Sequence, residues 1–297
     1  MNKRKIHEHI FKLISYLAGI TTVLILFGIL GKITIEAMPS LSLYYILTPE
    51  SDSPRFGGAI ANAIVGTVFL SVLSTAMATP AAVGTAIYLK RYAKDSHFAR
   101  MIGFVIDVLA GTPTIVIGLF GLLVLVFYLR PITGGFSLIS GSIALAILII
   151  PVIERAAEKA IERVPHDIEE ASYAMGATRW DTLRLITLPY ALTGIVTGIV
   201  LSIGRAAEAS AVIILTAGYT QFLPEFKVLA NERLLFGIKI YPFQDLVAAL
   251  PITVYHAYEF PHFVSPSEGF AAAFVLIVIV MLINATTRLL LWKRRIG

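Results

Sequence analysis

Long uncharged, apolar stretches alternate along this chain with shorter stretches that carry its charges. Each uncharged stretch is near or above the roughly 20 residues with which a helix crosses a hydrocarbon core of about 30 Å. We therefore expect an all-α, polytopic membrane protein with about six transmembrane helices. The second stretch is long enough either to begin outside the core or to break at Thr79 and Pro80, since proline interrupts a helix. The uncharged stretches are 13–31, 56–89, 108–129, 131–153, 185–204 and 269–287.

Composition and charge agree with a membrane location. Hydrophobic residues make up 57% of the chain and charged residues only 14%, which is unlike a soluble domain. Of the 24 lysines and arginines, 17 lie in the N-terminal segment, in 90–100, in 155–184 and in 288–295. Positive flanks are retained on the cytoplasmic side, so both termini should be cytoplasmic. The net charge of +5 is then explained by topology and by the lipid bilayer, and no nucleic-acid partner is expected.

The inner loop 154–189 interrupts the apolar pattern with charged and small residues at helical spacing. Pro165 suits the first turn of a helix, and Asp167 opposes the positive end of the helix dipole. Gly176 either ends this helix or lets another backbone come close. By periodicity alone, the segment is also typical of an ordinary amphipathic helix on the membrane surface.

The same loop resembles the EAA signature of permease subunits of ABC importers. That signature is Glu-Ala-Ala, three residues, Gly, nine residues, Ile, one residue and Leu-Pro; here a serine replaces the second alanine. The resemblance implies a helix that docks in a cleft of a separate ATPase and couples its closure to the spans. The chain has no Gly-x-x-x-x-Gly-Lys-Ser/Thr sequence, so we expect ATP and Mg on the partner ATPase and no cofactor here. The matching positions are Glu170, Ala171, Ser172, Gly176, Ile186, Leu188 and Pro189.

Further residues narrow the resemblance to the PstA family of phosphate-importer permeases and extend it over almost the whole chain. Singly, Asn62 is typical of an interhelical hydrogen bond, and Gly-Thr-Pro of a packed kink. We therefore expect Asn62, Thr112 and Pro113 to serve in helix packing or in a gate. The residues that carry this resemblance are Asn62 to Ile64, Gly66, Thr67, 111–120, Pro151, Pro165, Gly204 and Arg205.

The family implies a type I ABC importer permease fold and a mechanism of alternating access. The implied partners are a PstC-like second permease subunit, a PstB-like ATPase dimer and a PstS-like extracytoplasmic phosphate-binding protein. The implied location is the plasma (inner) membrane of a prokaryote. In these terms 1–57 holds the N-terminal cytoplasmic segment, the first span and an outer loop, and 58–292 is the permease domain. The coupling loop is 154–189, the outer insert 218–268 and the cytoplasmic tail 293–297.

Arg205 and Glu208 interrupt the fifth span, where an ionised side chain is costly unless it is paired or faces water. Three residues apart, they share one helical face and can neutralise each other as a local ion pair. The other interpretation places both in the substrate pathway, with Arg205 attracting an oxyanion through its fork of donors. The family pattern has its glutamate four residues after the arginine. The shorter spacing leaves open a different pairing partner, a local bulge or a different oxyanion.

The outer insert 218–268 is rich in aromatic residues and prolines, and we expect short helices at the outer interface. They serve as an aromatic belt, as a docking surface for a partner, or as both. Asp107 is expected at an interface, and Gly194 with Gly198 in helix packing.

Rival functions remain open at this stage. One is a permease for sulfate, molybdate or phosphonate, or a PstC-like subunit; another is an anion transporter or channel without an ATPase. No catalytic residues are assigned, since no nucleophile motif is present. The histidines form no recognised metal-binding motif, so no metal site is assigned, and the chain contains no cysteine.

Overall fold

The computed structural model describes residues 3–93, 96–231, 234 and 237–295. Five of the described helical segments are long and apolar enough to cross a membrane. They are α1 (Lys3–Ala37), α3 (Ala61–Ile87) with the π-helical η2 (Tyr88–Tyr92), α7 (Leu138–Glu162), α9 (Arg179–Thr182) with the π-helical η4 (Leu183–Thr187) and α10 (Leu188–Glu208), and α13 (Pro266–Arg295).

A sixth span is formed only if two bent segments count as one. Helix α4 (His97–Gly111) is followed by α5 (Thr114–Gly121) and the π-helical η3 (Leu122–Tyr128), at an angle of 102°. Thr112 at the break is extended, as the residue before a proline usually is. The prediction of about six spans is thus confirmed, with the third span sharply broken.

Helix α3 decides between the two arrangements that the sequence allowed for the second span. It begins at Ala61, so the uncharged residues 56–60 precede the helix, and it continues through Pro80 without a break. Directly before the proline, the Thr79 hydroxyl donates to the carbonyl of Thr75, one turn earlier in the helix, at 2.7 Å. The second alternative, a break at Thr79 and Pro80, is therefore wrong, since packed neighbours can accommodate a proline inside a helix.

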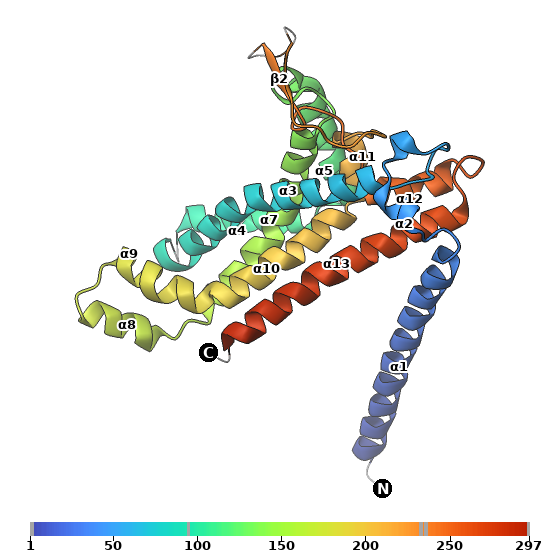
Figure 1. Cartoon of the computed structure of the whole chain (residues 1–297). Helices are drawn as coiled ribbons and strands as arrows, with labels where there is room; N and C mark the ends of the chain where they lie inside the picture. The colour runs from blue at the N-terminus through green and yellow to red at the C-terminus, as the bar shows by residue number, and fades with distance from the viewer. Residues whose placement is uncertain (1–2, 94–95, 232–233, 235–236, 296–297) are drawn as a thin grey trace.

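The centre of the bundle is α7, which packs along both α3 and α10, while α1 stands apart and meets α13 near its outer end (Figure 1). Small residues allow the close approach of α10 to α7. A Cβ atom at Gly194 would lie 2.5 Å from Cβ of Ala160, and one at Gly198 would lie 2.3 Å from Cβ of Ala156. The predicted packing role of the two glycines is therefore confirmed.

The outer insert differs from its prediction. It contains only one helix of ordinary length among its described residues, α12 (Leu250–Glu259), and it adds a β-hairpin of β1 (Val228–Ala230) and β2 (Ile238–Ile240). The strands are antiparallel, with Val228 opposite Ile240. Helix α12 agrees with the expectation of short helices, whereas the hairpin was not expected; β-branched residues on both of its arms favour strand pairing. Lys239 also lies 4.3 Å from the ring centroid of Tyr241 just beyond β2.

Four short helical segments complete the chain: α2 (Leu43–Leu47), the 3₁₀ turn η1 (Glu50–Asp52), α6 (Arg130–Thr133) and α11 (Ser210–Thr216). The remaining helix, α8 (His166–Ala174), belongs to the inner loop.

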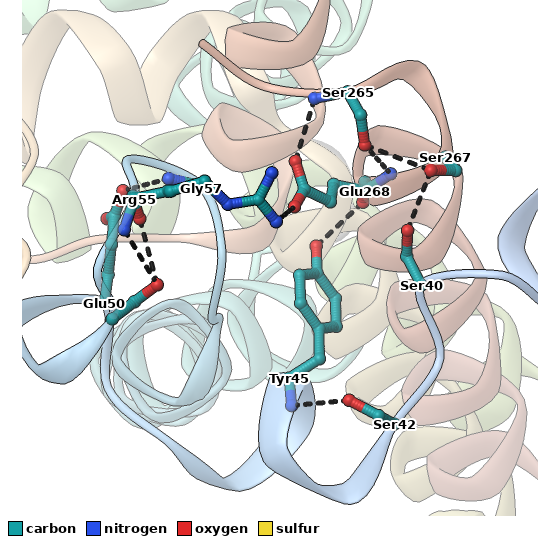
Figure 2. A network of polar contacts seen from close by, with 10 residues as sticks. Ser40, Ser42, Tyr45, Glu50, Arg55, Gly57, Ser265, Ser267 and Glu268 are labelled. Atoms are coloured by element: carbon teal, nitrogen blue, oxygen red, sulfur yellow. Dashed lines mark hydrogen bonds and ion pairs between the residues drawn. The ribbon is translucent and has the colours of Figure 1, made fainter.

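A polar network ties the outer loop to the start of α13 (Figure 2). Glu268 is 5% exposed; its carboxylate accepts from the backbone N–H of Ser265 at 2.8 Å and pairs with Arg55 at 3.2 Å. The hydroxyl of Tyr45 donates to the carbonyl of Glu268 at 2.7 Å. Burial, together with the charge of Glu268, raises the pKa of the Tyr45 hydroxyl above its ordinary value. The hydroxyl therefore stays protonated and remains a donor.

A second buried carboxylate, Glu50, holds the entry to α3. It is 3% exposed and accepts from the backbone N–H of Gly57 at 2.7 Å and from the hydroxyl of Tyr219. Its own N–H donates to Oδ1 of Asn62 at 3.3 Å, and the Asn62 amide donates to the carbonyl of Thr220 at 2.8 Å. Asn62 therefore joins two outer segments, at Glu50 and at Thr220, to the start of α3.

Candidate functional site

The inner loop folds as the sequence predicts. Helix α8 begins after Pro165 and ends at Ala174, and Gly176 takes a left-handed conformation with φ +85°. The next helix, α9, starts with a capping box in which the Thr178 side chain accepts from the N–H of Asp181 and the Asp181 carboxylate accepts from the N–H of Thr178. The loop is therefore a defined helix–turn–helix projecting beyond the spans (Figure 1).

The signature residues divide into an exposed group and a supporting group. Glu170, Ala171 and Gly176 are exposed, so they are free to meet another molecule. Ser172 is half-buried, and its hydroxyl lies 3.0 Å from the hydroxyl of Thr182. The remaining members, Ile186, Leu188 and Pro189, lie where η4 passes into α10. The first group is thus open to solvent on α8 and the turn after it, while the last three residues lie along the segment that leads from α9 into the fifth span.

Apolar side chains are exposed beside the signature. Met175 is 87% exposed, Trp180 59%, Tyr173 44% and Ile168 42%. Large apolar side chains rimmed by charged ones are typical of a protein interface. These four side chains form a surface with the apolar character of a protein interface, which we call the α8 face.

The sequence analysis missed Glu169, the residue that anchors α8. It is 4% exposed, and its Oε1 accepts from Nε of Arg91 at 3.0 Å and from the hydroxyl of Thr187 at 2.5 Å. Nη2 of Arg91 also donates to the carbonyl of Ile161 at 2.9 Å. Glu169 and its neighbour Glu170 are both acidic and helical, so local sequence does not separate them. Ser172 lies three residues after Glu169 and therefore on the same face of α8. This spacing is the one signal in the sequence that could have identified Glu169.

Arg205 and Glu208 occupy the last turn of α10, just before a break at Ala209, where ψ is 66°. Both side chains are exposed. At about 100° per residue, positions 197, 201, 205 and 208 fall within about 80° of one another around the axis. Thr197 and Leu201 are also exposed, so the four residues form one stripe along α10, which we call the α10 stripe.

No hydrogen bond or ion pair joins Arg205 to Glu208 or to any other described residue. The interpretation as a local ion pair is therefore wrong. Both residues are exposed and lie within the last turn of α10, which ends at Glu208 before the turn at Ala209. Their assignment to a substrate pathway stays a prediction.

Thr112 and Pro113 lie at the 102° bend, where α4 gives way to α5. The hydroxyl of Thr112 donates to the carbonyl of Val108 at 2.7 Å, which closes the last turn of α4. Pro113 is the N-cap residue of α5 and carries no N–H. The Gly-Thr-Pro sequence is therefore a helix break and not a packed kink within one helix.

Charged residues gather where α3, α4 and α7 end on the inner side. Asp107 of α4 pairs with Arg155 of α7, which also donates to Glu158 at 2.6 Å. Lys90 lies 3.1 Å from Glu158. Glu154 is fully buried, and within the described part of the chain neither of its carboxyl oxygens accepts a hydrogen bond. Asp107 was expected at an interface, and it has a partner within its own chain.

Known proteins resemble the chain over most of its length. Residues 78–292 match the family described as "Binding-protein-dependent transport system inner membrane component". The probable ABC transporter permease protein YqgI of Bacillus subtilis (strain 168) is 35% identical over 197 residues, which span 66% of this chain and 65% of that one. The phosphate transport system permease protein PstA 1 of Mycobacterium tuberculosis (strain CDC 1551 / Oshkosh) is 33% identical over 246 residues, 81% of this chain and 74% of that one.

A solved structure of the MetNI methionine ABC transporter, in an inward-facing conformation, has the same fold. Its TM-score is 0.57 at 16% identity, and the match covers 79% of this chain and 93% of that one. Among the residues that the structure describes, no group of three or more His, Asp or Glu side chains is arranged to hold a metal ion.

Proposed function

The chain belongs to the family of binding-protein-dependent transport system inner membrane components, and on this premise we propose that it is the permease subunit of an ATP-driven phosphate importer. The observation that carries the proposal is the 33% identity to a PstA permease over 81% of the chain. The α8 face supports it, because an exposed docking helix between two spans is what a permease driven by a separate ATPase requires.

In this function, the chain forms half of the pathway and a PstC-like permease forms the other half. A PstB-like ATPase dimer, which binds ATP and Mg, takes the α8 face into its cleft. A PstS-like binding protein delivers phosphate at the outer surface. Closure of the ATPases draws the α8 helices together and opens the pathway outward, and hydrolysis returns it inward. Both termini lie in the cytoplasm in this arrangement, in agreement with the positive inner segments.

Arg205 is the residue we assign to phosphate attraction. Its guanidinium is exposed on the α10 stripe and has no carboxylate partner among the described residues, so its fork of donors is available to an oxyanion. Glu208 lies on the same stripe and limits how tightly the anion is held, since repulsion between two anions weakens binding. Weaker binding lets the anion leave the site and continue along the pathway. The family pattern has its glutamate four residues after the arginine, and the three-residue spacing of this pair supports the rival hypothesis that the oxyanion is sulfate, molybdate or phosphonate.

The experiment compares ATP-driven uptake of phosphate and sulfate into vesicles that contain the chain with its partner permease, ATPase and binding protein. We expect phosphate-selective uptake that falls at least about tenfold in Arg205→Ala, because a hydrogen bond to a charged group contributes about 1.5–3 kcal/mol. Arg205→Lys should restore part of the rate, since lysine keeps the charge but not the fork. Arg130→Ala, an exposed arginine outside the α10 stripe, is the matched control. Equal uptake of sulfate would refute the substrate, and uptake without ATP would refute the coupling.

A further inference from the structure

A single carboxylate connects the docking helix α8 to three membrane spans. Glu169 contacts Arg91 of η2, at the inner end of the α3 span, and Thr187 of η4, at the inner end of the α10 span. Arg91 in turn donates to the carbonyl of Ile161 in the last turn of α7. These four residues, which we call the inner junction, join segments that are far apart in the sequence.

Little else holds α8 in place. Its closest packing is against α9 and η4, and most of its side chains are exposed. On the side of Glu169 and Arg91 lies a cavity of about 630 Å³, which is also lined by Lys90, Tyr173 and Arg179. A helix that borders a cavity cannot transmit force through broad packing there. The Ser172 to Thr182 contact at 3.0 Å joins α8 only to the next turn of the same loop.

The inner junction consists of largely buried, charged hydrogen-bonding groups. Glu169 is 4% exposed, and the side chain of Arg91 is 17% exposed. Charge-assisted hydrogen bonds are shorter and stronger than neutral ones. Without the Glu169 carboxylate, the Arg91 guanidinium keeps its bond to the carbonyl of Ile161 but no longer holds α8, so the docking helix loses its link to the α3 and α7 spans. Lys90, next to Arg91, adds contacts to α7 through Glu158 at 3.1 Å.

We propose that Glu169, held by Arg91 and Thr187, is the positioning residue through which movement of α8 is passed to the α3, α7 and α10 spans. The proposal rests on the proposed function, because it assumes that an ATPase moves α8. It assigns different tasks to two adjacent glutamates. Exposed Glu170 meets the ATPase, and buried Glu169 connects α8 to the membrane helices.

The test uses the complete complex in vesicles, with phosphate uptake and ATP hydrolysis measured on the same preparation. In Glu169→Gln we expect the ATPase to co-purify and to hydrolyse ATP as in the wild type. Phosphate transported per ATP should fall at least about tenfold, the effect of losing a hydrogen bond to a charged group. A side chain with only a structural role would lower assembly and both rates together, and would leave the ratio unchanged. An unchanged ratio in Glu169→Gln overturns the proposal.

Two further variants keep the outcome decisive. Thr187→Val conserves shape and removes one bond to Glu169, so it should lower the same ratio by a smaller factor. If Glu169→Gln does not assemble, Thr187→Val decides, and a wild-type ratio there overturns the proposal. Glu170→Gln is the contrasting variant, and it should weaken retention of the ATPase without changing the ratio for the complexes that remain. If no ATPase co-purifies with the wild-type chain, the proposed function fails, which is a different result from failure of the junction.

Discussion

Replacing Gly66 with alanine should destabilise the outer half of the bundle. A Cβ atom at this position would lie 2.0 Å from the carbonyl oxygen of Ala248 and 2.6 Å from Cγ2 of Val247. Real Cβ contacts do not fall below 3.0 Å, so the segment that precedes α12 must move by about 1 Å. That segment is fixed to α3 by the N–H of Leu250, which donates to the Thr67 hydroxyl at 2.8 Å.

The magnitude follows from these two contacts. Overpacking costs about 1–3 kcal/mol, and a buried N–H that loses its acceptor costs a further 1–3 kcal/mol or so, which places Gly66→Ala at about 2–6 kcal/mol of lost stability. The assay is thermal unfolding of the purified protein in detergent, together with amide hydrogen exchange at Leu250. The melting temperature should fall, and the Leu250 amide should exchange faster.

Gly84 provides a matched control on the same helix. A Cβ atom there would have no atom within 4 Å, so Gly84→Ala should be neutral or should stabilise α3 by about 0.5–1 kcal/mol. The reasoning would be refuted if Gly66→Ala and Gly84→Ala melted alike, or if exchange at Leu250 did not change.

Three further predictions concern other parts of the chain. Gly176→Ala should cost about 1–2 kcal/mol because an L residue is strained at φ +85°, and it should reduce retention of the ATPase; equal retention in a pull-down would contradict this. Gly198→Ala should separate α10 from α7 and cost about 1–3 kcal/mol in a thermal melt, whereas Gly103→Ala, with open space around it, should not. Burial lowers the pKa of His256, so the neutral form is favoured in the folded state. Its stabilising contribution is complete above the ordinary value of about 6.5 and is lost as pH falls through the lowered pKa. The melting temperature should therefore fall between about pH 7 and 5, and less so in His256→Phe, while an equal fall in both proteins would exclude this histidine.

Local signals explain what the sequence predicted well. The helix after Pro165 and the turn at Gly176 depend on backbone properties of single residues, so α8 lies where expected. The spans follow from uncharged stretches, whose physical requirement is only length and apolarity. The type I ABC importer permease fold that the resemblance implied is also confirmed. The bend at Pro113 is a detail that hydropathy does not predict.

Long-range contacts explain what the sequence could not give. Glu169 is buried and Glu170 exposed because Arg91 and Thr187 come from other spans, and nothing near the two glutamates in the sequence distinguishes them. The hairpin in the outer insert depends on pairing between its two arms, which aromatic and proline content does not reveal. Periodicity places Arg205 and Glu208 on one face of α10, but it does not say whether two exposed side chains on that face meet.

The position of α1 has a consequence for how the protein is made. Its membrane-crossing window has no buried residues, and among the described residues of α1 the buried one is Ala37, which packs in a cluster with α2, α3 and α13. A helix that satisfies its own backbone hydrogen bonds can enter the lipid as soon as it is synthesised. The α3, α7, α10 and α13 helices can then assemble afterwards without waiting for side chains from α1. Substitutions along α1 should accordingly change how efficiently the nascent chain is inserted and oriented, and leave the folding of the finished bundle largely unaltered.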